Sequence, residues 1–274
     1  MQPLQAFRHA ASITTLFTDI DDTLTTEGAL RADAYDALER LHRAGLRIVP
    51  VTGRPAGWCD HIARLWPVDG IIGENGALYY WYDRRMRKLR VRHIDDEATR
   101  EKHRQLLAVV RDEILRTVPG CALASDQFCR LNDLAIDFCE DVPPLPADQV
   151  DRVVGLMKQA GMTARVSSIH VNGWFGTYDK LSMTGRFIAE QWGERLDILR
   201  EHSVFVGDSP NDEPMFHYFP HSVGVANILQ FAARMHALPT YITRANGGQG
   251  FVELAEHLLA SRGGSDAGAP GSPS

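Results

Sequence analysis

Hydrophobic runs of strand length alternate with amphipathic stretches of helical spacing in the first third of the chain. The runs predicted to be strands are Ile13–Phe17, Leu46–Val51 and Gly70–Ile72. Between the first two, Ala34, Leu38 and Leu41 recur at helical spacing, and a second helix is predicted over Ala56–Leu65. Strands that alternate with helices in this way predict a parallel sheet flanked by helices. Ligands of such sheets bind beyond the carboxyl ends of the strands.

The pattern changes between about residues 77 and 177, where a hairpin, a long helix over 97–118 and several short strands are expected. From Lys180 onward strands and helices alternate again. The predicted fold is therefore a doubly wound, Rossmann-like α/β core with an inserted α+β domain. We place the core at 1–82 and 178–262, the inserted cap domain at 83–177, and a disordered tail rich in Gly, Ser and Pro at 263–274.

Composition narrows the functional classes. The formal net charge is −6 and the isoelectric point is about 6.0, which argues against a nucleic-acid binder. A dense basic run at 84–92 is followed at once by Asp95, Asp96 and Glu97, so we interpret it as a solvated hairpin edge. No apolar stretch approaches membrane-spanning length, and the short, interrupted apolar run near the N-terminus does not predict a signal peptide. These observations favour a cytoplasmic protein.

The cysteines are Cys59, Cys121, Cys129 and Cys139. They form no C-x-x-C pair, so we expect reduced thiols and no metal cluster built on them.

An acidic motif, Thr18-Asp19-Ile20-Asp21-Asp22-Thr23, follows the first predicted strand directly. Three carboxylates within four residues repel one another unless a cation is bound nearby. Oxygen-rich sites of this kind suit Mg²⁺, which binds a few carboxylates together with phosphate oxygens. The alternative is an ordinary acidic turn, since Asp is common in loops.

A second acidic motif, Gly207-Asp208-Ser209-Pro210-Asn211-Asp212, follows another hydrophobic strand. Its structural alternative is a turn in which Asp212 caps a helix. The two acidic strand ends can meet only if their strands are neighbours in one sheet. Between them in sequence lie Thr52, at the end of a third strand, and Lys180, before a helix. A hydroxyl group, a lysine and a metal ion together can neutralise the charge of a phosphoryl group and position it.

In these motifs the chain resembles the haloacid dehalogenase superfamily of phosphohydrolases. The four matching motifs, in order, are Asp19-x-Asp21-x-Thr23, Thr52, Lys180 and Gly207-Asp208-x-x-Asn211-Asp212. The resemblance covers about residues 13–82 and 178–260. Asp22 departs from it, because the sugar phosphatases of the superfamily usually have glycine at this place.

The resemblance implies a role for each matching residue. Asp19 would be the nucleophile that forms an aspartyl-phosphate, and Asp21 the general acid and then the general base. Mg²⁺ would be held by the Asp19 carboxylate, the Asp21 backbone carbonyl and Asp208. The presence of an acid at position 21 points to an oxygen leaving group, because the dehalogenases of the superfamily lack it.

Further positions complete the implied site. Thr52 and Lys180 would hold the phosphoryl oxygens. Gly53 and Arg54 follow Thr52, and Arg54 either approaches the substrate or caps the strand end. Asn211 and Asp212 would support the metal shell, and which of them contacts the metal stays open.

The substrate is less determined than the chemistry. Gly73-Glu74-Asn75-Gly76-Ala77 resembles the start of the cap in phosphatases of sucrose phosphate, trehalose phosphate and mannosyl-phosphoglycerate. Within the cap, His170, Asn172 and Trp174 share one face of a predicted strand and could contact a sugar. Their alternative is a solvent-facing polar stripe with one packed Trp. For Arg130 we favour an exposed surface position over contact with a second anionic group.

The sequence therefore predicts a Mg²⁺-dependent phosphatase of a small phosphorylated metabolite, a sugar phosphate or sugar-acid phosphate. We expect no nucleic-acid partner, no membrane, and a monomer or homodimer. A phosphomutase of the same superfamily and a non-catalytic sugar-phosphate-binding module stay open as alternatives.

Overall fold

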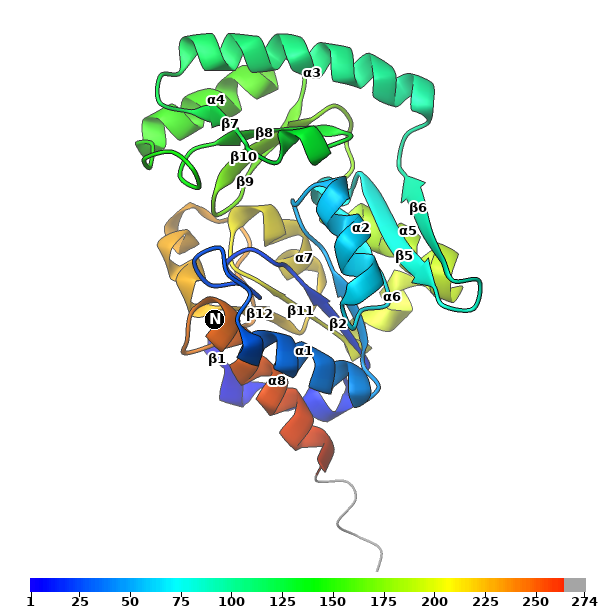
Figure 1. Ribbon diagram of the computed structural model, residues 1–274. Helices are drawn as coiled ribbons and strands as arrows, with labels where there is room; N and C mark the ends of the chain where they lie inside the picture. Colours follow the sequence, from blue (N-terminus) through cyan, green and yellow to red (C-terminus); the bar gives the residue numbers. More distant parts are fainter. Residues whose placement is uncertain (264–274) are drawn as a thin grey trace, which may run out of the picture. The chain divides into compact units, whose positions relative to one another are not determined.

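The computed structural model describes residues 1–263 (Figure 1). These residues form two compact units. Unit 1 comprises 1–48, 197–208 and the part of the chain from 216 onward, and unit 2 comprises 49–196 and 209–215. Of the predicted tail, only Gly263, the last residue of a helix, lies within the described residues. The proposed boundaries of core and cap stay a prediction.

The main sheet follows the parallel arrangement that the sequence predicts. In spatial order its strands are β1 (Gln2–Pro3), β13 (Tyr241–Ile242), β12 (Ser222–Gly224), β11 (Ser203–Gly207), β2 (Thr15–Thr18) and β3 (Arg47–Pro50). The first five of these pair in parallel. Phe205 lies opposite Phe17 and Val206 opposite Thr18, so β11 and β2 end at the same edge of the sheet. This register brings the two acidic strand ends together.

Two helices of unit 1 lie side by side along the sheet, as Figure 1 shows. They are α1 (Ala32–Arg43) and α8 (Gly247–Gly263). The predicted apolar face of α1 buries Leu38 and Leu41, and α8 buries Leu254 and Leu258. Burial of such side chains stabilises the fold by about 1.5–3 kcal/mol each.

Unit 2 contains a small antiparallel sheet beside two helices. Its strands are β4 (Ile71–Gly73), β5 (Leu78–Asp83) and β6 (Lys88–His93), and its helices are α2 (Ala56–Leu65) and α5 (Lys180–Trp192). Helix α5 begins with a capping box in which Asp179 accepts a hydrogen bond from Ser182 N and Asp179 N donates to Ser182 Oγ. This cap fixes Lys180 as the first residue of the helix.

A four-stranded antiparallel sheet, also in unit 2, is covered on one face by two helices (Figure 1). The strands, in spatial order, are β7 (Ala122–Leu123), β8 (Asp133–Asp137), β10 (His170–Trp174) and β9 (Thr163–Val166), and the helices are α3 (Glu97–Thr117) and α4 (Ala147–Gln159). Leu107, Val110 and Ile114 of α3 pack with Val153 and Met157 of α4 in one apolar core. The helical spacing in the sequence predicts this face of α3.

The fold class that the sequence predicts is confirmed: a large parallel sheet with helices, accompanied by antiparallel sheets. Two short helices, α6 (Leu196–Leu199) and α7 (Glu213–Tyr218), complete the α-helices of the described chain. The two-residue strands β1 and β13 were not predicted, because neither has enough residues to show a pattern. Across residues 1–263, every helix is too short or too polar to cross a lipid bilayer.

Candidate active site

Asp19 follows β2 and is buried, with 4% of its surface exposed. Its backbone N–H donates to Val206 O at 2.8 Å, which extends the pairing with β11 by one residue. Beyond it the chain turns around the carbonyl of Ile20, which accepts hydrogen bonds from the backbone N–H groups of Thr23, Leu24 and Thr25. The turn leaves Asp21 half-buried, three residues beyond the end of β2.

Asp22 takes a left-handed backbone conformation with φ of +52°. This region favours glycine, and among other residues Asn and Asp enter it most readily. The conformation explains how an Asp fits a position at which the resemblance leads us to expect glycine. Its backbone N–H donates to Thr25 Oγ1 at 2.9 Å, so the turn keeps its shape.

Asn227, which is not among the residues predicted for the site, connects the two acidic motifs through hydrogen bonds within unit 1. Its Nδ2 donates to Asp22 O and to Asp208 Oδ2, each at 3.0 Å. Its Oδ1 accepts from Gly247 N at 2.9 Å, which fixes the orientation of the amide. Asp208 itself is fully buried. No motif surrounds Asn227, so no signal in one sequence could have identified it.

In unit 2, Lys180 forms a buried ion pair with Asp212. Lys180 Nζ lies 2.6 Å from Asp212 Oδ1, and the two side chains are 1% and 0% exposed. Asp212 also accepts a hydrogen bond from Ser209 N at 3.3 Å. Ser209, and not Asp212, is therefore the residue that caps the turn Pro210–Asp212.

Asn211 contacts Asn75, a second residue that carries no signal of its own in the sequence. Its Nδ2 donates to Asn75 Oδ1 at 3.3 Å, and its Oδ1 accepts from Ser209 Oγ at 2.9 Å. Asn75 has φ of +54° and is buried. The motif Gly73–Ala77 marked this region, but not this side chain.

Thr52 is fully buried after β3. Its backbone N–H donates to Ile72 O at 2.9 Å, and its Oγ1 accepts from Arg54 N at 3.0 Å. A Cβ atom on Gly53 would lie 3.2 Å from Asn75 Nδ2 and 3.6 Å from Asn172 Oδ1. Glycine at position 53 therefore lets two amide side chains approach the backbone beside Thr52.

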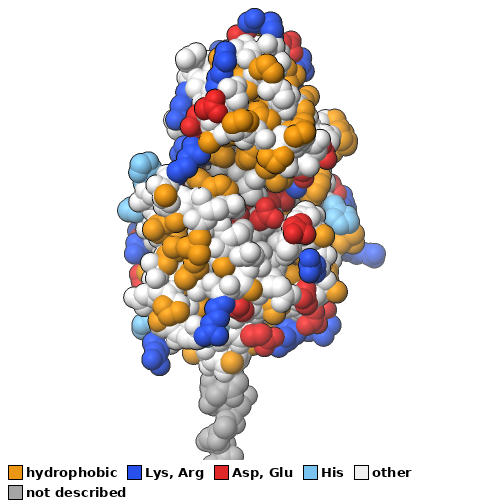
Figure 2. Space-filling model, turned by 90° about the vertical axis from the view of Figure 1, so that its left-hand side faces the viewer, with side chains coloured by type: hydrophobic (Ala, Val, Ile, Leu, Met, Phe, Trp, Pro, Cys, Tyr) orange, Lys and Arg blue, Asp and Glu red, His pale blue; other side chains and the backbone are white. Residues whose placement is uncertain are grey.

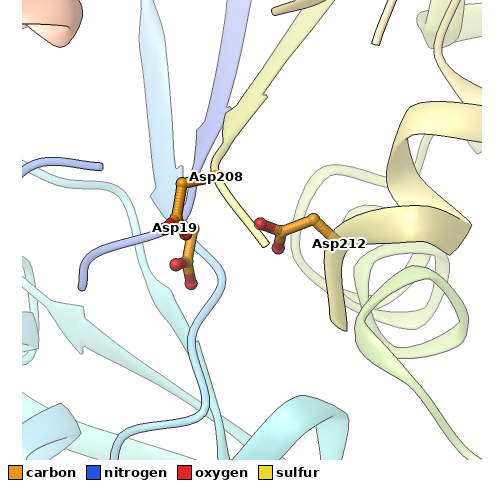
Figure 3. Close-up of side chains that lie close together, drawn as sticks. All are labelled: Asp19, Asp208 and Asp212. Atoms are coloured by element: carbon orange, nitrogen blue, oxygen red, sulfur yellow. The ribbon is translucent and has the colours of Figure 1, made fainter. Parts of the chain in front are cut away.

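Asp19, Asp208 and Asp212 are buried, and each offers a carboxylate oxygen within 4.8 Å of the others. Figure 3 shows Asp19 and Asp208 side by side, with the carboxylate of Asp212 directed toward them. Three like charges at this separation are unfavourable unless a cation offsets them, and Lys180 supplies one positive charge at Asp212. An all-oxygen donor set of carboxylates fits Mg²⁺, which takes one or two of them together with phosphate oxygens and water.

The Arg54 side chain is buried and forms ion pairs, so it does more than cap the end of a strand. Its Nη2 donates to Glu140 Oε1 at 2.8 Å, and its guanidinium carbon lies 4.3 Å from the centre of the Trp58 ring. His170 Nε2 lies 2.9 Å from Glu140 Oε2. The hydrogen bond from His170 and the charge of Arg54 lower the pKa of Glu140 to about 2, against the opposing effect of burial.

Arg130 is buried, so the expected exposed position is wrong. Its side chain has no exposed surface and pairs with Asp126 at 2.9 Å and with Asp133 at 3.1 Å. Its Nη1 also donates to Gly53 O at 2.9 Å. Two carboxylates and a carbonyl satisfy the guanidinium, and this compensates for the cost of burying its charge.

His170, Asn172 and Trp174 lie on β10 and are all buried, so a solvent-facing stripe is also wrong. Asn172 Nδ2 donates to Asp133 Oδ2 at 3.0 Å. The Trp174 indole donates to Tyr178 O at 3.1 Å and stacks on the Tyr178 ring, so it is packed inside unit 2. Of the three, the structure brings His170 and Asn172 into the polar network around Gly53 and Arg54.

The basic run at 84–92 lies on the β5–β6 hairpin, whose tip is exposed as expected. Figure 2 shows one face of the molecule, on which basic side chains are interspersed with acidic and hydrophobic ones. The four cysteines are free thiols, and Cys59 is the buried one.

Comparison with known proteins supports the resemblance found in the motifs. Residues 16–113 match the family of haloacid dehalogenase-like hydrolases. A phosphoglycolate phosphatase of Pyrobaculum neutrophilum is 28% identical over 251 residues, which span 89% of this chain and 95% of that protein.

Solved structures share the fold at low sequence identity. Protein 0175 of Thermoplasma acidophilum superposes with a TM-score of 0.67 at 16% identity, covering 90% of this chain and 98% of that one. The sucrose-phosphatase of Synechocystis, solved with sucrose and phosphate, has a TM-score of 0.61 at 15% identity. The match covers 89% of this chain and 97% of that one. The match over residues 16–113 bears out the predicted resemblance to haloacid dehalogenase-like hydrolases, and the phosphatase names among these relatives support the predicted enzyme class.

Proposed function

We propose that this hydrolase is a Mg²⁺-dependent phosphatase that cleaves a small phosphomonoester through an aspartyl-phosphate on Asp19. The observation that carries the proposal is the group of three buried carboxylates: Asp19 and Asp208 directly after β2 and β11, and Asp212 in the turn Pro210–Asp212. A binding protein would gain nothing from burying three carboxylates, whereas phosphoryl transfer needs a nucleophile and a metal site together.

The residues proposed to hold Mg²⁺ are Asp19, Asp208, the backbone carbonyl of Asp21, and Asp212. When bound, the ion would offset the negative charge of the phosphoryl oxygens. Asn227 orients the Asp208 carboxylate, because its amide donates to Oδ2. Second partners of this kind orient metal ligands and fix their geometry.

In the proposed reaction, a carboxylate oxygen of Asp19 attacks phosphorus. The bond from phosphorus to the leaving oxygen breaks, and that oxygen takes a proton from the Asp21 carboxyl group. The Asp21 carboxylate then removes a proton from a water molecule, whose oxygen attacks the same phosphorus. The bond to Asp19 breaks, and inorganic phosphate leaves with the Asp19 carboxylate restored.

Thr52, Gly53, Lys180 and Asn211 are the proposed phosphate-binding residues. Thr52 offers a hydroxyl group, Lys180 a positive charge, and Asn211 an amide. Lys180 also offsets the charge of Asp212, with which it is paired. Groups of this kind stabilise the charge that develops on the phosphoryl oxygens during transfer.

For the leaving group, we propose a sugar or sugar acid, read by residues of the inserted domain 83–177 together with Arg54. His170 and Asn172 are the proposed contacts, and Glu140 and Asp133 hold them in place. The relatives act on both chemical types, since one is a sucrose-phosphatase and another a phosphoglycolate phosphatase.

The test is phosphate release from a panel of neutral sugar phosphates and carboxylated phosphates, with Mg²⁺ and with EDTA. We expect turnover that requires Mg²⁺ and that Asp19→Asn abolishes. Asp22→Asn is the matched control, because it removes a carboxylate from the same turn and suits the left-handed backbone; it should retain activity. An isomeric phosphate ester without phosphate release would show a mutase, and binding without turnover would show a binding module.

A further inference from the structure

Glu74 lies at the centre of a tightly constrained turn between β4 and β5 in unit 2. It is fully buried, and both it and Asn75 have positive φ, +46° and +54°. Glycines flank them closely: a Cβ on Gly73 would lie 2.4 Å from Cys59 Sγ, and one on Gly76 2.1 Å from Asp179 O. Non-glycine residues keep such backbone conformations only where the surroundings impose them, and they concentrate at functional sites.

The carboxylate of Glu74 accepts four hydrogen bonds, which fill both of its oxygens. Oε1 accepts from Ala56 N at 3.0 Å and Leu131 N at 2.8 Å. Oε2 accepts from Asn132 N at 2.7 Å and Asn132 Nδ2 at 2.9 Å. An ionised carboxylate only accepts hydrogen bonds, so all four donors are satisfied; a protonated one would direct an O–H toward one of them.

The same turn fixes the loop that presents Thr52. Glu74 N donates to Arg54 O and Asn75 N to Thr52 O, each at 3.0 Å. Together with the bond from Ala56 N, these contacts hold residues 52–56 along one side of Glu74. On its other side, Leu131 and Asn132 belong to the segment that also reaches Gly53 through Arg130.

We propose that Glu74 is a positioning residue, whose ionised side chain holds the phosphate-binding loop 52–56 and the segment 130–132 together in one geometry. Its effect on turnover rests on the proposed phosphatase function. Its effect on the two segments does not.

The charges facing Glu74 make its ionisation sensitive to pH. Burial, and after it the negative charge of Asp133, raise the pKa of Glu74 to about 7, against the opposing effects of the Leu131 and Ala56 N–H groups and of Arg130. The neutral titratable groups that share its surroundings are Cys59, Tyr80 and Tyr178. We therefore expect this buried carboxylate to take up a proton around neutral pH.

The test is Glu74→Gln, which keeps the shape but places an amide NH₂ against two of the four donors. We expect kcat/KM to fall by about tenfold to 100-fold, as for small misplacements of reacting groups. The wild-type loss of kcat/KM between pH 8 and pH 6 should become smaller in the variant. Asp137→Asn is the matched control, since Asp137 is a buried carboxylate that also accepts backbone N–H groups, those of Cys139, Glu140 and Asp141. It should keep the wild-type pH dependence.

A readout that needs no activity is hydrogen exchange of peptides covering 52–56 and 130–132. After correction for the intrinsic rate, protection of both segments should fall from pH 8 to pH 6 in the wild type and be low at both values in Glu74→Gln. Unchanged protection in the wild type overturns the proposal even if the variant fails to fold. If protection of both segments changes as expected but the protein has no phosphatase activity, the positioning role is supported and the proposed function is refuted.

Discussion

Lys180 Nζ lies 2.6 Å from Asp212 Oδ1, and both side chains are buried. The pair places a positive charge at the end of the acidic motif that follows β11. Because both charges are buried, removing one takes away a charge that offsets the other. The pair therefore links local stability to the charge balance of the proposed active site.

Replacement of Lys180 by Met should affect both properties. We expect kcat/KM to fall by about 100-fold to 1,000-fold, the usual effect of losing one group that stabilises transition-state charge. The free energy of unfolding should fall by about 3–5 kcal/mol, because the buried Asp212 carboxylate loses the lysine that offsets its charge. Steady-state kinetics and urea unfolding measure the two effects. Lys158→Met, on the exposed side of α4, is the matched control and should change neither.

Metal removal gives a second prediction, which concerns stability alone. Mg²⁺ binds the folded carboxylates, so the melting temperature of the wild type should rise with Mg²⁺ concentration. Asp208→Asn should abolish this dependence. Without Mg²⁺ the same variant should melt above the wild type, because one of three mutually repelling charges is gone.

Differential scanning fluorimetry with Mg²⁺ and with EDTA measures both outcomes for Asp208→Asn. A wild type whose melting temperature ignores Mg²⁺ would contradict the proposed metal site.

Glu140 predicts a dependence of stability on pH. Its pKa is about 2 in the folded protein, below the ordinary value of 4.5, because of His170 and Arg54. An acid with a lowered pKa stabilises the fold above its unfolded pKa, and this contribution is lost as pH falls toward the folded value. Glu140→Gln should therefore lower the free energy of unfolding by about 2–3 kcal/mol at pH 7, and by progressively less as the pH falls from 5 to 3.

Urea unfolding of Glu140→Gln and the wild type at several pH values provides the measurement. Glu113→Gln removes an exposed ion pair with Arg116 and should cost less than about 1 kcal/mol at every pH. If the free energy of unfolding of Glu140→Gln differs from that of the wild type by the same amount at every pH, the proposed pairing is refuted.

The backbone of Asp22 gives a prediction about local strain. At φ of +52°, glycine avoids the clash that an L side chain suffers. We expect Asp22→Gly to raise the free energy of unfolding by about 0.5–1 kcal/mol, and Asp22→Val to lower it by more than that. Destabilisation by glycine as large as that by valine would show that the Asp22 side chain, and not the backbone, stabilises the turn.

The parts of the fold that follow from local patterns could be predicted. The helical spacing of Leu107, Val110 and Ile114 gave the buried face of α3, and two hydrophobic runs ending in Asp gave the neighbouring strands β2 and β11. In both cases the signal lies within a few residues of the element itself. The positions of Asp19 and Asp208 at one edge follow from the geometry of parallel strands.

The contacts that depend on distant partners could not be predicted. Arg130 is buried because Asp126, Asp133 and the carbonyl of Gly53 surround it, and Gly53 is far away in the sequence. Asn227 contacts Asp22 across a separation of 205 residues, larger than the 77 between Gly53 and Arg130. A lone Arg or Asn carries no local signal for such contacts, whereas a polar residue on an apolar strand, such as Asn172, at least marks itself as unusual.

The central claim is that Asp19 carries the phosphoryl group, and acid-quenched mass spectrometry tests it most directly. The enzyme is mixed with Mg²⁺ and its best substrate, stopped in acid during turnover, and digested. Our account predicts a phosphoryl group on the peptide that contains Asp19, absent in Asp19→Asn and in the presence of EDTA. Rapid phosphate release by the wild type with no phosphoryl group on that peptide, together with an active Asp19→Asn variant, would contradict it.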